Sequence, residues 1–442
     1  MLPCYASGMK YVLAVLILAG ACGDDRPWQF DAAEEVRELP MFEDVPIVRM
    51  TREEFAAEAE ANAAEIDDET LQYYADTYGR LGFFARDLDL RPVLAGSSSD
   101  WVGATYSPGR KLITLVGDAA DDVLVHEAVH AIQDQHFDIG AYDLSTSDGF
   151  LARRAVVEGD ATLAQYRFYG EYVGQPRFGL EGWDWQRTIE ARRGYAEDAL
   201  VGAVYPVVFL DYVSFVYSRG FEYSIANLVG ATFADPTPGL PPYDWSLQDA
   251  LYTERPPSAT HGILELDLQT TFEPIPIGIA DVPVELIDQL ELVDWDRLGR
   301  WYAYLLLFPV RDQLAFAAET VAAAWRGDRA LFLRTVDGAA TSTLWVSEWA
   351  DTTSAAVVGD ALWLLYGRTP IKDAPATRAL ADDGEVVHVE VRGTRLVAAK
   401  NLVPAALDVL VETAFTTDTT AAPRRRPSLP AFKLRFDFAG TR

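Results

Sequence analysis

The stretch His126-Glu127-Ala128-Val129-His130 constrains this chain more than any other feature of its sequence. Residues four apart lie on one face of an α-helix, so a helix here brings both imidazoles to one point. Neutral imidazole nitrogen is a ligand that zinc accepts. Glu127 is angled away from the histidine pair, which suits a general base acting on water at the metal. The pattern is specific, because the chain contains only 5 histidines.

Two residues are candidates for the third protein ligand that a catalytic zinc requires. His136 has the spacing of the pattern H-E-x-x-H-x-x-G-x-x-H, but Gln133 stands where that pattern needs glycine for a sharp turn. The same pattern is accompanied by a downstream methionine turn, and all 4 methionines precede the motif. We therefore expect His136 to be structural.

The second candidate is Glu158, which stands in a second predicted helix over residues 151–172. Gly159 follows it directly. A glycine inside a helix costs up to about 1 kcal/mol relative to alanine, so it usually serves close packing. We expect Gly159 to let this helix approach the histidine helix, and Glu158 to reach the metal from there.

The stretches HEAVHAIQDQHFD, from His126, and VEGDAT, from Val157, resemble those of gluzincin-type zinc metallopeptidases, in particular bacterial and archaeal surface lipoproteins. The resemblance implies that His126, His130 and Glu158 hold Zn²⁺, that Glu127 is catalytic, and that the substrate is a peptide or protein. It also implies a strand along the cleft, which we expect at residues 112–116. A free edge of that strand would bind an extended peptide.

The sequence departs from the thermolysin-like pattern at Thr162, where an aspartate would orient a ligand histidine. We expect Asp160 or Asp134 to take that supporting role. A peptidase also needs a hydrogen-bond donor for the negative charge that develops on the reacting carbonyl oxygen. The resemblance suggests a histidine or tyrosine, and the candidates are His261, Tyr205 and Tyr166.

The N-terminus predicts export. Residues 11–21 form an uncharged apolar run that is too short to span a bilayer but suits a secretory signal. Cys22 follows small residues, as in bacterial lipoprotein signals, in which this cysteine is acylated. We therefore expect a signal peptide over residues 1–22 and a lipid anchor at Cys22, in the cell envelope on its periplasmic or cell-surface side. Cys4 is the only other cysteine, which leaves no thiol catalyst after cleavage.

Composition and element signals predict an α+β fold. Hydrophobic residues make up 50% of the chain, and its net charge of −30 argues against nucleic acid as a partner. We expect a tether over residues 23–46, a mainly helical metallopeptidase domain with a small sheet over 47–270, and an α+β domain over 285–442. Further helices are predicted over 51–76, 118–134, 183–228 with a break at Pro206, and 301–325. Strands are predicted over 101–105, 331–336, 343–349, 385–391 and 395–399. The turn residues Ser107-Pro108-Gly109 and Gly393-Thr394 predict two hairpins, and Thr51 and Asp118 are the expected helix caps.

Two functions agree with these features. The first is an exported zinc-dependent peptidase with Glu127 as the general base. The alternative is a non-catalytic zinc-binding surface lipoprotein that binds or scaffolds a partner. The complete motif favours the peptidase, because Glu127 has little structural reason to stand beside a ligand histidine.

Overall fold

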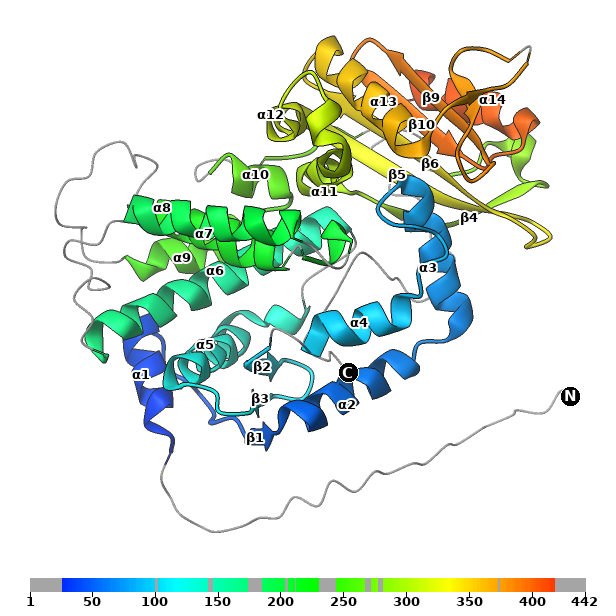
Figure 1. The fold of residues 1–442 in the computed structure, drawn as a ribbon. Helices are drawn as coiled ribbons and strands as arrows, with labels where there is room; N and C mark the ends of the chain where they lie inside the picture. The colour runs from blue at the N-terminus through cyan, green and yellow to red at the C-terminus, as the bar shows by residue number, and fades with distance from the viewer. Residues whose placement is uncertain are drawn as a thin grey trace, which may run out of the picture.

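The chain has an α+β fold in the computed structural model (Figure 1). Within the described residues, no helix combines the length and the apolar character needed to cross a bilayer. The residues that the structure describes are 26–99, 102–141, 146–173, 185–202, 206–210, 212–229, 244–266, 272–276, 281–372 and 374–417.

The N-terminal half contains a small three-stranded sheet in the order β1-β3-β2. Strand β2 (Ala104–Ser107) pairs antiparallel with β3 (Leu112–Val116), as the predicted hairpin requires. Strand β1 (Ile47–Met50), which was not predicted, pairs in parallel with the other side of β3. The expectation of a free edge on residues 112–116 is therefore wrong, since that strand is central and β2 lies at the edge.

Helix α1 (Trp28–Arg37) occupies much of the segment that was predicted to be a tether. Its Phe30 and Val36 are buried in the same apolar cluster as residues of α5 (Asp121–Phe137) and α6 (Ser147–Glu171). The prediction failed because a short helix with many acidic residues shows little apolar periodicity of its own. Packing against two longer helices stabilises it instead.

The helix predicted over residues 51–76 is two helices. Helix α2 (Arg52–Ala64) begins after a Thr51 cap, as expected, and α3 (Asp68–Leu81) begins after a second cap. That cap is Asp67, whose carboxylate accepts the Thr70 N–H at 2.7 Å. The chain then continues into α4 (Leu90–Ser99).

The two helices of the motif region follow the sequence closely, with shifted starts. Helix α5 begins after Ala120 rather than at the Asp118 cap that was expected. Gly159 of α6 does serve close packing, but its neighbour is α8: a Cβ atom added there would lie 2.2 Å from the Gly220 oxygen. The surrounding helices are α7 (Trp185–Val201), α8 (Tyr217–Val229), α9 (Trp245–Thr253) and α10 (Thr260–Leu264), and the break expected near Pro206 separates α7 from α8.

The C-terminal half is built on a seven-stranded antiparallel sheet in the order β4-β5-β6-β10-β9-β8-β7. The predicted turn at Gly393 is confirmed and has a left-handed φ of 62°. The strands are β4 (Leu290–Asp296), β5 (Trp325–Thr335), β6 (Thr341–Trp349), β7 (Thr369–Pro370), β8 (Arg378–Leu380), β9 (Val386–Arg392) and β10 (Arg395–Lys400).

Helices cover both faces of this sheet. Leu396 and Ala398 of β10 share a buried cluster with α13 (Thr352–Tyr366), whereas Val397 and Ala399 share another with α14 (Pro404–Thr416). Alternate residues of a strand point to opposite faces, which explains this division. Both faces of β10 being buried also explains why its residues 396–399 form an unbroken apolar run.

The single helix predicted over residues 301–325 is interrupted. Helix α11 (Gly299–Leu307) passes into a 3₁₀ turn over Phe308–Gln313, and α12 (Ala318–Ala323) ends just before β5. Pro309 lacks the N–H that a continuing α-helix requires, so the helix ends there.

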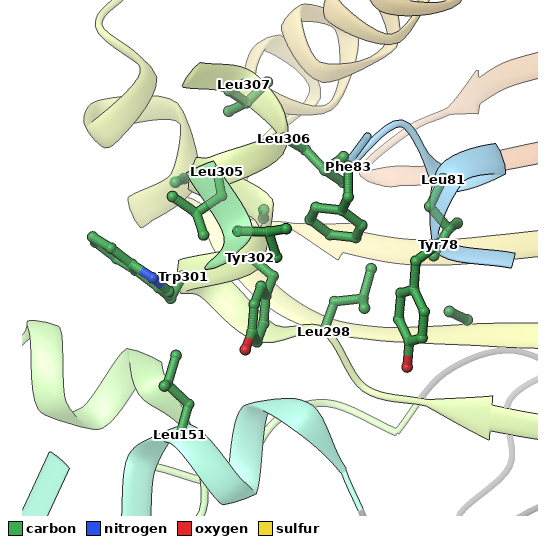
Figure 2. Packing of buried hydrophobic residues seen from close by; sticks show 14 of the residues in the cluster. Tyr78, Leu81, Phe83, Leu151, Leu298, Trp301, Tyr302, Leu305, Leu306 and Leu307 are labelled. Carbon is green, nitrogen blue, oxygen red and sulfur yellow. The ribbon is translucent and has the colours of Figure 1, made fainter. Parts of the chain in front are cut away.

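One buried cluster joins the two halves. It contains Tyr78 of α3, Leu151 of α6, Tyr302 of α11 and Trp345 of β6. Figure 2 shows α11 packed between α6 and the end of α3. The apolar core is therefore continuous across the predicted domain boundary near residue 280.

Candidate metal centre

Helices α5 and α6 bring three potential ligands together. The Nε2 atoms of His126 and His130 are 3.0 Å apart, and Oε2 of Glu158 lies 3.2 Å from the first and 3.1 Å from the second. All three side chains are buried. The helical spacing of the two histidines and the position of Glu158 are thus as the sequence predicts.

Each of these three atoms can offer a lone pair toward the same point when both imidazoles carry their proton on Nδ1. Each residue offers one ligand atom, and within the described chain this is the group that can hold a metal ion. A buried set of converging acceptors is unfavourable unless a proton or a cation lies between them. The arrangement therefore fits a bound metal ion.

The charges around Glu158 favour its ionised form. Burial alone raises the pKa of this carboxyl, but His130, His126 and the nearby Arg154 guanidinium lower it well below its usual range. Arg154 donates to Oε1 of Glu158 at 3.0 Å, which leaves Oε2 for the histidine pair. An ionised carboxylate with one oxygen held by its neighbour is suited to a single bond to a metal.

Glu127 lies beside this group without belonging to it. The backbone N–H of Tyr106, on the edge strand β2, donates to its Oε2 at 2.6 Å. Burial raises the pKa of Glu127, against the opposing charges of His130 and His126. The carboxyl is thus held in place, and its pKa is shifted toward the range useful for proton transfer.

One of the two expected supporting carboxylates reaches the site, and only through another residue. Nδ1 of His130 lies 2.8 Å from Oε1 of Gln133, whose Nε2 donates to Asp160 at 2.9 Å. Asp134 instead accepts hydrogen bonds from Tyr106 and Lys111, each at 2.6 Å. A supporting role for Asp134 at a ligand histidine is therefore wrong.

Two of the proposed oxyanion donors have contacts with other residues, and the third is not described. The His261 ring stacks on Phe272, with centroids 4.0 Å apart. The Tyr166 hydroxyl accepts a hydrogen bond from Arg192 at 3.2 Å. Tyr205, like the lipidation candidate Cys22, lies outside the described residues.

His136 is structural, as predicted. Its Nε2 lies 2.8 Å from the Pro40 carbonyl oxygen, and its ring packs on Phe42 at 4.2 Å. The sequence did not single out Tyr217 of α8, whose ring centroid lies 6.1 Å from that of His126. Nothing in the spacing around Tyr217 distinguishes it from other tyrosines, because α8 meets α5 only through the tertiary fold.

Compared with known proteins, the chain matches no protein-family model, no curated protein and no solved structure. Inference about its function therefore rests on the geometry of the metal centre.

Proposed function

We propose that this protein is a zinc-dependent peptidase that hydrolyses peptide bonds. The observation that supports the proposal is the convergence of His126, His130 and Glu158, with Glu127 held beside them. Two histidines and a glutamate are a ligand set found in catalytic zinc sites, which keep a further position open. The N-terminal signal supports export and a lipid anchor at Cys22 as part of the same proposal.

The spacing of the ligand atoms supports zinc. In a tetrahedral site with bonds of roughly 2.0–2.1 Å, two ligand atoms lie about 3.3–3.4 Å apart. The separations among the three atoms here are 3.0, 3.1 and 3.2 Å, so these atoms would need to move apart only slightly to hold the ion. Calcium and magnesium prefer oxygen ligands, which disfavours them at a site with two imidazoles.

Glu127 is the general base in this proposal. Zinc held by His126, His130 and Glu158 would act as a Lewis acid and would lower the pKa of water to about 7. Glu127 takes a proton from the attacking water and passes it to the leaving amine. The Tyr106 N–H fixes one oxygen of Glu127 and leaves the other for this exchange.

Strand β2 is the element that we propose for substrate binding. The carbonyl oxygens of Gly103 and Ser107 accept N–H groups from Val116 and Lys111, so these residues face β3. The N–H and C=O groups of successive residues in a strand point to alternate sides. In agreement with this, the Tyr106 N–H points away from β3 and donates to Glu127. Ala104 then also faces outward, which offers an extended peptide a backbone partner beside the metal centre.

The test combines metal analysis with peptide cleavage. Purified protein should hold close to one zinc ion per chain and cleave members of a peptide library, and a chelator should abolish that cleavage. The variant Glu127→Gln should keep its zinc but lose turnover by roughly 10²–10⁴-fold, which is what a positioned general base contributes. Zinc binding without cleavage of any peptide would instead support a non-catalytic binding lipoprotein.

A further inference from the structure

A chain of buried hydrogen bonds leads from the N-terminal helix α1 to a metal ligand. Arg37, the last residue of α1, contacts the Asp160 carboxylate through Nε at 2.9 and 3.1 Å. Asp160 accepts from Gln133 at 2.9 Å, and Gln133 contacts His130 Nδ1 at 2.8 Å. The side chains of Arg37 and Asp160 are both 0% exposed. Helix α1, which lies in the segment that was predicted to be a tether, therefore places its last residue next to the candidate metal centre.

The chemistry of each group fixes the direction of every hydrogen bond in this chain. An arginine can only donate, and a carboxylate paired with it can only accept. The Gln133 Nε2 also donates to the Val157 carbonyl oxygen at 3.0 Å, so two acceptors surround it. The reversed amide would direct its oxygen at both acceptors, which is repulsive. The Gln133 oxygen must therefore face His130.

This orientation determines which nitrogen of His130 carries the proton. Because the Gln133 oxygen only accepts, Nδ1 of His130 must donate to it. In the neutral imidazole the other nitrogen, Nε2, is then free of hydrogen and can bind a metal. Nε2 is also the atom that faces His126 and Glu158.

Among the described residues, Arg37 is the charged donor that contacts Asp160, and its guanidinium has further partners that anchor it. The guanidinium also pairs with Asp249 at 2.5 Å and lies 4.5 Å from the Trp245 ring centre. The Tyr252 hydroxyl adds a neutral hydrogen bond to Asp160 at 2.7 Å. Without Arg37, the Asp160 carboxylate would lose the charged donor that holds it toward Gln133, and it would no longer dictate how the Gln133 amide is oriented.

The other histidine ligand has no such support. Among the described residues, His126 Nδ1 is buried without a hydrogen-bond partner. The hydrogen bonds that fix a ligand in its metal-binding form are thus concentrated on His130.

We propose that Arg37 is a positioning residue of the metal centre, so that helix α1 is part of the site rather than a linker to it. Through Asp160 and Gln133, Arg37 holds His130 with a proton on Nδ1 and a free Nε2. This inference rests on the proposed metal site but not on peptidase activity.

The experiment measures zinc affinity by competition with a chromophoric chelator, for the full chain and three single variants. Arg37→Met should weaken zinc binding by roughly 10–100-fold, which is typical for loss of a group supporting a ligand. Arg37→Lys, which keeps the charge, should recover part of that loss. Arg167→Met is the matched control, because Arg167 holds the end of α1 through the Val36 carbonyl at 3.0 Å but lies outside the relay. It should bind zinc as the wild type does.

A double-variant measurement separates positioning from general loss of stability. Gln133→Leu removes the relay but leaves the contact between Arg37 and Asp160, and it should weaken zinc binding to a similar extent. If both residues act through one path, the double variant Arg37→Met with Gln133→Leu should bind zinc about as tightly as the single variant with the lower zinc affinity. Nitrogen-15 NMR of the zinc-loaded wild type should show the His130 proton on Nδ1, with more than one state in Gln133→Leu.

The outcomes divide clearly. Folded Arg37→Met with unchanged zinc affinity would overturn the inference, as would additive losses in the double variant. If Arg37→Met fails to fold, the test rests on Gln133→Leu. An unchanged zinc affinity in Gln133→Leu would show that the relay does not support His130. Zinc binding by the wild type without peptide cleavage would refute the proposed function and leave this inference standing. A wild type that binds no zinc would refute both.

Discussion

Two of the buried carboxylates in the described chain, Glu158 and Asp328, have surroundings that are opposite in kind. At Glu158 in the N-terminal half, the nearest atoms include two imidazole nitrogens that can act as lone-pair donors to a metal. At Asp328 in the C-terminal half, three N–H groups point at the carboxylate. They come from the Leu298 and Gly299 backbones at 2.8 and 2.9 Å and from the Trp325 ring at 3.0 Å.

A second carboxylate beside Asp328 is satisfied in the same way. Asp148 accepts from the Thr260 backbone and hydroxyl at 2.8 and 2.7 Å and from Arg297 at 2.9 Å. These contacts join the start of α6 to the strand-to-helix turn before α11. Fully paired carboxylates of this kind hold two parts of a chain together and need no ion.

The comparison shows that burial of acidic groups does not by itself indicate a metal site. Glu158 and Asp328 are both buried, yet the pKa of the first is lowered and that of the second is raised. What distinguishes them is the charge of their neighbours: two imidazoles and the Arg154 guanidinium lie beside Glu158, whereas Asp328 has neutral N–H donors and the negative charge of Asp148 nearby.

Removing a carboxylate should abolish metal binding at the first site alone. Glu158→Ala leaves two imidazoles without a negative ligand, so we expect zinc affinity to fall by roughly a thousandfold, beyond the 10–100-fold typical of supporting groups. Asp328→Asn is the matched control and should retain zinc with wild-type affinity. Metal content after dialysis against a weak chelator measures both. Normal zinc content in Glu158→Ala would exclude it as a ligand.

Filling the space beside the second site should destabilise the fold without changing the metal site. A Cβ atom at Gly299 would lie 1.9 Å from Oδ1 of Asp148, and the φ of Gly299 is +80°. We expect Gly299→Ala to lower the free energy of unfolding by about 3 kcal/mol, from backbone strain and displacement of a buried carboxylate.

A second glycine separates these two contributions. Gly338 has a φ of +73° and no atom within 4 Å of an added Cβ, so Gly338→Ala should cost only about 1 kcal/mol. Denaturant unfolding measures both variants. Equal losses would show that the contact with Asp148 contributes nothing. Zinc affinity of the folded Gly299→Ala protein should be unchanged.

The sequence predicted the parts of the site that depend on local spacing. His126 and His130 required only a helix, and Glu158 required only a second helix packed beside the first. The hairpins at residues 104–116 and 386–400 followed from turn residues in the same way. These features are properties of short stretches, which a single sequence displays.

The missed features all depend on contacts between distant segments. Arg37 and Asp160 are far apart in the sequence, and nothing near either of them indicates the other. Strand β1 was missed because its partner β3 is remote, and the close neighbour of Gly159 was assigned to the wrong helix for the same reason. Gln133 was within reach of sequence reasoning, since it stands one helical turn after His130 on the same face.

The pH dependence of stability should distinguish the two carboxylate sites once more. Burial raises the pKa of Asp328 to about 7, with the charge of Asp148 adding to the effect and the three N–H groups opposing it. Between its ordinary value of 3.8 and about 7, the folded protein therefore holds a proton that the unfolded chain has lost. Its contribution to stability is complete below that window and is lost as the pH rises through it.

Comparing the wild type with Asp328→Asn isolates this contribution, because other titrating groups are common to both. Asparagine does not titrate, so its own effect on the free energy of unfolding is the same at every pH. We expect the difference in unfolding free energy to change by at most about 1.4 kcal/mol per pH unit between pH 4 and 7, with the wild type losing stability relative to the variant. The pKa of Glu158 is lowered, so its contribution to stability follows the reverse trend. That contribution is lost as the pH falls, and only at more acidic pH. A constant difference from pH 4 to 7 would show that the N–H groups keep Asp328 ionised, as cations do for Glu158.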